Sequence, residues 1–103
     1  DVVKVNFYFW EHPEISGIFN CGTGHAHQFN TLAKGVLKHF GSGELEYVPF
    51  PEVLKGKYQS FTQADTANLL AAGYDGGFTP IEDAIAEYCE LLDKTGGYYV
   101  YER

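Results

Sequence analysis

Apolar residues recur with helical spacing in two long stretches of the chain. Between residues 29 and 40 they fall at i, i+3, i+4, i+7, i+8 and i+11, namely Phe29, Leu32, Ala33, Val36, Leu37 and Phe40. The second stripe, within residues 81–92, comprises Ile81, Ala84, Ile85, Tyr88, Cys89 and Leu92. Because such spacing places side chains on one helix face, we predict two amphipathic helices.

Signals for helix ends accompany both stripes. Gly41 is expected to end the first helix, because a left-handed cap strains every residue type except glycine. Thr79 is expected to be the N-cap of the second helix, with Pro80 as its first residue and Glu82 completing a Thr-x-x-Glu capping box. Asp65 is expected to cap a further short helix that ends near residue 72.

Two short apolar runs predict strands. Residues 18–21 stop at a glycine turn, and residues 45–48 stop at a proline-rich turn, as buried strands do. Residues 1–12 fit both a strand, with alternating Val3, Val5, Phe7 and Phe9, and a broad helical stripe. Residue type favours the strand, and the sequence pattern alone does not decide. The sum is a mixed α/β unit with three to four helices and few, short strands.

Size and composition fit one compact domain. The chain has 103 residues, of which 17% are aromatic, so a core that buries roughly two thirds of the unfolded surface is expected. A net charge of −7 with no basic cluster argues against a nucleic-acid partner. No apolar run is long enough for a membrane span, and the start of the sequence lacks the basic region followed by an apolar stretch that a signal peptide has. The absence of methionine suggests that the sequence begins inside a longer protein.

The cysteines and histidines offer one metal-binding hypothesis. Cys21, His25 and His27 lie within seven residues, and His39 could supply a fourth ligand. Their spacing matches no common zinc motif, and Cys21 is expected at the buried end of a strand. We therefore expect no metal site and two free thiols, and a small metal-binding domain remains the alternative.

Two loops could bind anions. The turn Gly22-Thr23-Gly24 precedes a helix as a phosphate loop does, but the third glycine of a dinucleotide fingerprint is replaced by His27, which argues against a cofactor site. The segment Lys55-Gly56-Lys57-Tyr58-Gln59 combines two ammonium groups, a flexible glycine and a phenol. An anionic group docked there would meet charge and directional donors, although a solvated surface loop has the same composition. No nucleophile, base and oxyanion site assemble from the sequence.

The middle of the chain resembles a known family. Pro49-Phe50-Pro51, Leu54-Lys55-Gly56-Lys57-Tyr58-Gln59, Phe61-Thr62-Gln63-Ala64-Asp65 and Ala71-Ala72-Gly73-Tyr74-Asp75 resemble the C-terminal part of ADP-glycero-manno-heptose 6-epimerases. These enzymes are extended short-chain dehydrogenase/reductases. Ser16-Gly17-Ile18-Phe19-Asn20 with the glycine turn resembles the same family, and the likeness extends over residues 1–92.

The resemblance implies a fold for this chain and a function for each domain of the enzyme. It implies that residues 1–95 form the small mixed α/β substrate domain, that residues 1–12 are helical, and that the glycine turn is a structural loop. The NADP-binding Rossmann domain, with its catalytic tyrosine and lysine, would be absent from this chain, so no catalytic, cofactor-binding or metal-binding residue is expected here. Tyr58 matches a family tyrosine that contacts the ADP-sugar, and Lys57 stands where the family often has arginine.

Further expectations follow from the same resemblance. The partners would be ADP-heptose, the protein's own N-terminal Rossmann domain and further copies in a homo-oligomer, in a cytoplasmic enzyme that supplies lipopolysaccharide biosynthesis. The chain alone would be inactive. Residues 96–103, a tyrosine-rich tail, continue beyond the family pattern. Two alternatives stay open, which are a non-catalytic interaction or oligomerisation domain and another nucleotide-sugar epimerase or dehydratase of the superfamily.

Overall fold

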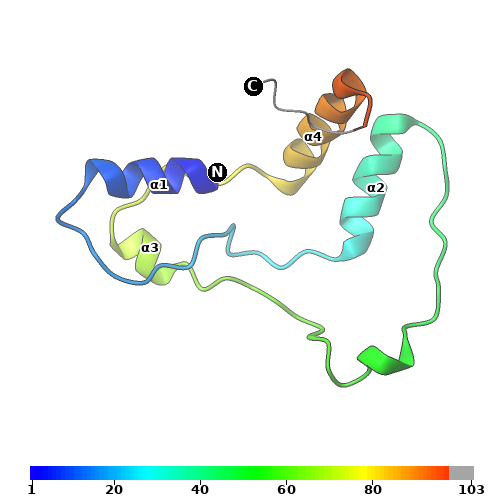
Figure 1. Cartoon of the computed structure of the whole chain (residues 1–103), viewed down its shortest axis with the longest axis horizontal. Coiled ribbons are helices and arrows are strands. Elements are labelled where there is room, and N and C mark those ends of the chain that lie inside the picture. Colours follow the sequence, from blue (N-terminus) through cyan, green and yellow to red (C-terminus); the bar gives the residue numbers. More distant parts are fainter. Residues whose placement is uncertain (98–103) are drawn as a thin grey trace. The chain divides into compact units, whose positions relative to one another are not determined.

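A computed structural model describes residues 1–97 of the chain, and within them the regular structure is helical. The elements are α1 (Val2–Glu11), α2 (Phe29–Phe40), the 3₁₀-helix η1 (Glu52–Leu54), α3 (Ala67–Ala71) and α4 (Ile81–Thr95) (Figure 1). Each of two compact units is built from two separate stretches of sequence. Residues 1–26 and 52–79 form the first unit, and residues 27–51 with the chain from residue 80 onward form the second.

The expected strands at 18–21 and 45–48 are wrong, because no strand occurs in the part of the chain that the structure describes. A strand needs a neighbouring strand to take its backbone hydrogen bonds, and neither run has one. The side chains confirm that no sheet face is buried, since Ile18 is 91% exposed and Val48 is 74% exposed. The mixed α/β prediction therefore holds for its helices only.

The helical alternative for residues 1–12 is confirmed by α1. Its inner face packs into the core of the first unit, where Val5, Leu69 and Tyr74 are buried. Aromatic side chains surround this core, and the Phe9 ring stacks on Phe19 with centroids 4.5 Å apart. The Tyr8 hydroxyl donates to the Ala72 carbonyl at 2.6 Å, so the phenol is satisfied where α1 meets the end of α3.

The second unit is formed by α2 packed on α4. Ile85 and Cys89 of α4 are its buried side chains, and α2 presents Gly35 to Ile85. A Cβ at Gly35 would lie 2.9 Å from Ile85 Cγ2, so glycine lets the two helices approach closely. His39 and Asp93 join the same helices through a contact of 2.9 Å between Nε2 and Oδ2.

The helix ends agree with the sequence in part. The expected end of α2 is confirmed, with Gly41 in the left-handed conformation at φ 67°. Thr66, not Asp65, occupies the N-cap position of α3, although Asp65 Oδ1 accepts the backbone N–H of Ala67 at 3.0 Å, so the expected cap is confirmed only in this one bond. The capping box at α4 is wrong, because Pro80 is the N-cap and no side chain caps the helix. Thr79 instead donates to Asp1.

The core is smaller than the length suggested. Among the described residues, the buried apolar side chains are Val5, Leu69, Tyr74, Ile85 and Cys89, and of these only Leu69 is fully buried. Burial of two thirds of the unfolded surface would need a larger set. Many large apolar side chains are instead exposed, so the expectation of one extensive core is wrong. Of the tyrosine-rich tail expected at residues 96–103, residues 98–103 lie outside the described part of the chain.

Candidate functional site

The Lys55-to-Gln59 segment follows η1 and forms a tight turn. The backbone N–H groups of Lys57 and Tyr58 both donate to the Leu54 carbonyl at 3.1 Å, and Gly56 has a φ of 70°, which only glycine adopts without strain. The turn leaves Lys57 exposed and the Tyr58 side chain 53% exposed. Both predicted binding residues therefore lie at the surface of one turn in the first unit.

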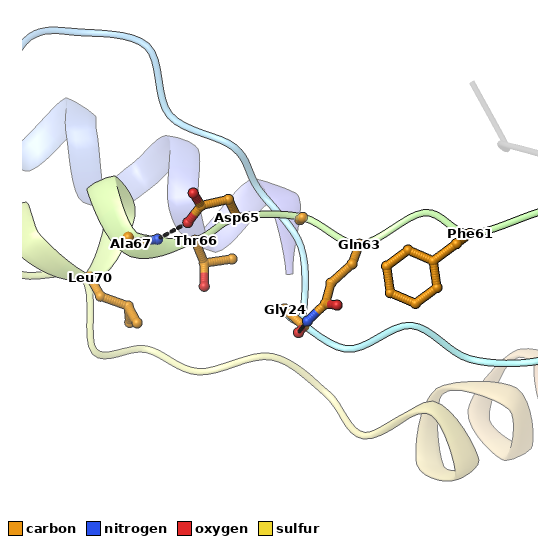
Figure 2. Close-up of a pocket in the computed structure, with 8 residues that line it drawn as sticks. Gly24, Phe61, Gln63, Asp65, Thr66, Ala67 and Leu70 are labelled. Carbon is orange, nitrogen blue, oxygen red and sulfur yellow. Dashed lines mark hydrogen bonds between the residues drawn. The ribbon is translucent and has the colours of Figure 1, made fainter. Parts of the chain in front are cut away.

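An open hollow of about 570 Å³ lies further along the same segment. Phe61 and Leu70 are at opposite ends of its lining, with polar atoms of Gln63 and Thr66 between them (Figure 2). Phe61 is 67% exposed and Leu70 is 61% exposed, so apolar surface remains available there. The remaining lining residues are Gly24, Ala64, Asp65 and Ala67. Tyr58 and Lys57 are not part of this lining.

The glycine turn is held against the segment that lines the hollow. Gln63 Nε2 donates to the Gly24 carbonyl at 2.6 Å, and Asn20 Nδ2 donates to the Asp65 carbonyl at 3.1 Å. A Cβ at Gly22 would stand 3.1 Å from the Ala64 Cβ, which is tighter than ordinary packing. The glycines therefore admit a close approach between two stretches some 40 residues apart, and this geometry favours a structural loop over a phosphate-binding one.

The metal-binding alternative finds no support in the described residues. Within residues 1–97, no three His, Cys, Asp or Glu side chains converge as metal ligands must. Both cysteines are free thiols as expected, but Cys21 is exposed and Cys89 is buried. The expectation of a buried Cys21 is wrong because the strand that would have buried it does not form.

These two features offer groups that are able to bind a polar ligand. The turn presents an ammonium and a phenol, which donate to phosphate or sugar oxygens. The hollow adds an aromatic face, an amide and a hydroxyl, which suit a flat polar ligand. Asn20 and Gln63 were missed as site-forming residues. The available signals were the position of Asn20 beside the glycine turn and the position of Gln63 within the Phe61-to-Asp65 motif.

Known proteins match nearly the whole chain. It is 50% identical over 98 residues to the ADP-L-glycero-D-manno-heptose-6-epimerase of Brachyspira hyodysenteriae, a match that covers 95% of this chain and 31% of that protein. The chain is similar to part of an ADP-heptose 6-epimerase. The protein of the same name from Alkalilimnicola ehrlichii is 52% identical over 92 residues, covering 89% of this chain and 29% of that protein. The resemblance inferred from the sequence is confirmed.

The chain spans about a third of the length of the relatives that it matches. No protein-family model matches it. Among residues 1–97, no helix combines the length and the apolar character needed to cross a bilayer.

Proposed function

We propose that this chain is the substrate-domain part of an ADP-glycero-manno-heptose 6-epimerase, and that it helps to hold the ADP-sugar. The observation that carries the proposal is the 50% identity over 98 residues to an enzyme of that name. In this proposal the complete enzyme inverts carbon 6 of the heptose. NADP held outside this chain would supply the hydride transfer that this inversion needs, in a cytoplasmic step of lipopolysaccharide biosynthesis.

The residues divide the work accordingly. Cofactor binding and proton transfer belong to the Rossmann domain outside this chain, so the 103 residues alone are inactive. Tyr58 donates its hydroxyl to the ADP-sugar, and Lys57 adds a positive charge to the same turn. The turn geometry supports these roles, because it exposes both side chains on one short stretch of backbone.

The proposed domain spans residues 1–95, with residues 96–103 as a separate tail. Gly96 has a left-handed conformation and caps α4, and the Gly97 N–H donates to the Leu92 carbonyl at 2.9 Å. These contacts support a boundary at the end of α4. Assembly of the complete enzyme into a homo-oligomer is part of the same proposal.

A chimeric enzyme tests the function. This chain replaces the matching segment of the Brachyspira hyodysenteriae epimerase, and the product is incubated with NADP and ADP-heptose. We expect epimerisation at carbon 6 by the chimera and none by the 103-residue chain alone. The unaltered relative and the relative without the segment are the controls.

Three results would overturn the proposal. A chimera that binds NADP but leaves ADP-heptose unchanged would refute the assigned substrate. Turnover of a different nucleotide sugar by that chimera would assign the chain to another epimerase or dehydratase. Epimerisation by the 103-residue chain alone would refute its inactivity.

A non-catalytic interaction domain is the second candidate function, and exposed apolar side chains favour it. In the second unit, Phe29 is 75% exposed and Tyr88 is 57% exposed, whereas soluble monomers rarely expose large contiguous apolar patches. Light scattering of the 103-residue chain tests it. A single monomeric mass over a wide concentration range would exclude self-association.

A further inference from the structure

Helix α1 has two apolar faces on opposite sides. Successive residues turn by about 100° in an α-helix, so Val3, Phe7 and Trp10 form one stripe, at i, i+4 and i+7. The inner face, with Val5, Tyr8 and Phe9, contacts the core of the first unit. The centre of the outer stripe lies about 180° from the centre of that inner face.

The outer stripe is uncovered within the first unit. Val3 and Phe7 are each 62% exposed, and Trp10 is 83% exposed. A surface helix normally carries charged or polar residues opposite its buried face, whereas a helix that is apolar on both faces is normally enclosed. A helix of ten residues is also far too short to cross a bilayer. The pattern on α1 is therefore that of an enclosed helix with one of its two neighbours absent from the first unit.

The size of the stripe indicates which neighbour is absent. From the areas that aromatic side chains usually bury, Val3, Phe7 and Trp10 offer on the order of 400 Å². A stable interface between separate molecules needs about 800 Å² on each partner. A contact within one polypeptide can be smaller, because it does not incur the entropy loss of association. The matched relatives are about three times as long as the matching segment. The rest of such a polypeptide is a neighbour that provides a contact of this kind.

We infer that the outer stripe of α1 is the face on which the remaining two thirds of an epimerase chain docks. This inference rests on the proposed function and names the surface through which the substrate domain joins the rest of the enzyme. Three side chains at i, i+4 and i+7 insert into an apolar groove in the manner of helix-in-groove contacts. Trp10, the only tryptophan of the chain, is the main anchor, as tryptophan often is in interfaces.

Thiol labelling measures this coverage directly. Trp10→Cys is introduced into both the 103-residue chain and the chimeric epimerase, and alkylation at that position is followed peptide by peptide by mass spectrometry. We expect labelling in the chimera to be slower by about tenfold or more, because a covered thiol reacts only after local opening. Val3→Cys provides a second reporter on the stripe. Glu11→Cys, at the exposed end of α1 beside the stripe, is the control and should change less.

The outcomes separate the docking inference from the proposed function. Equal labelling rates in the chain and the chimera, at both Trp10→Cys and Val3→Cys, overturn the docking inference. The docking inference is also overturned if these thiols in the 103-residue chain alone become protected from alkylation as its concentration rises. Such protection would show that a second copy of the chain covers the stripe. Protection in a chimera that fails to epimerise ADP-heptose supports docking and refutes only the function.

Discussion

Asp1 accepts two hydrogen bonds from Thr79, one from the backbone N–H at 2.8 Å and one from the hydroxyl at 2.9 Å. These residues are 78 positions apart, yet both belong to the first unit. The paired bonds occupy both oxygens of the carboxylate. Thr79 is thereby removed from the capping role that its neighbours in the sequence predict, and Asp1 makes no side-chain cap on α1.

Substitution Asp1→Ala should lower the free energy of unfolding by about 1 to 2 kcal/mol, because each lost bond has a charged acceptor and the carboxylate is only 25% exposed. Urea denaturation followed by circular dichroism measures this change. Glu82→Ala is the matched control, since Glu82 would complete the capping box that does not form. A larger loss from Glu82→Ala than from Asp1→Ala would contradict the assignment.

Gly35 should be difficult to replace even though it lies inside a helix. Alanine improves helix propensity by about 1 kcal/mol, but a Cβ 2.9 Å from Ile85 Cγ2 introduces overpacking that costs about 1 to 3 kcal/mol. We therefore expect Gly35→Ala to be destabilising or neutral. In an Ile85→Ala background the obstacle is gone, and Gly35→Ala should become stabilising. Equal effects in both backgrounds, measured by thermal denaturation, would show that the close approach is not what requires glycine.

Gln63 should stabilise the first unit by holding the glycine turn. Gln63→Ala removes the donor to the Gly24 carbonyl, and a loss of about 0.5 to 1.5 kcal/mol is expected for one neutral hydrogen bond. Gln59→Ala, at an exposed position of the preceding turn, is the control. Hydrogen exchange should show faster exchange at the backbone N–H of His25 in the first variant only. An unchanged exchange rate at His25 in Gln63→Ala would show that Gln63 does not hold the glycine turn.

Tyr58→Phe should weaken binding of ADP-heptose to the chimeric epimerase by about 0.5 to 3 kcal/mol, the range for one hydrogen bond to a neutral or charged acceptor. Isothermal titration calorimetry measures the affinity. Tyr88→Phe removes an equally exposed phenol from α4 and should leave binding unchanged. Identical affinities for both variants and the parent would remove Tyr58 from the substrate site.

Glu90 should titrate below its usual range. The Lys94 ammonium, which donates to Glu90 Oε1 at 2.7 Å, lowers the pKa of this carboxyl from its usual value of 4.5, first through the hydrogen bond and then through its charge. A lowered folded-state pKa means that the contribution of Glu90 to stability is present above pH 4.5 and is lost as the pH falls through the folded value. Carboxyl chemical shifts should show the pKa of Glu90 rising in Lys94→Ala. An unchanged pKa of Glu90 in Lys94→Ala would show that the contact with Lys94 is not what lowers it.

Local patterns predicted the elements that depend on local physics. The stripe from Phe29 to Phe40 and the glycine at 41 together define α2. Both signals, the helical periodicity and the left-handed cap, depend only on residues that are close in the sequence. The pattern of residues 1–12 was ambiguous because both faces of α1 are apolar, so alternation and helical spacing fit equally. The run at 45–48 has the composition of a strand, but a strand also requires a partner that a local pattern does not contain.

The same limit applies to the candidate site. The exposed turn at Tyr58 could be read from adjacent lysine, glycine and tyrosine residues. The bonds from Asn20 to the Asp65 carbonyl and from Gln63 to the Gly24 carbonyl join segments far apart in the sequence. Nothing near Asn20 identifies its partner, so the way in which the hollow is held together became visible only in three dimensions.

The division of each unit into two stretches of sequence affects synthesis of the protein. In the first unit, residues 1–26 pack on residues 52–79, which are synthesised later. In the second unit, residues 27–51 likewise pack on residues that begin at position 80. On the ribosome, neither unit can therefore close until most of the 103 residues have emerged. Val5 lacks its core neighbours Leu69 and Tyr74 throughout this interval, and a nascent chain with exposed apolar surface is a substrate for chaperones.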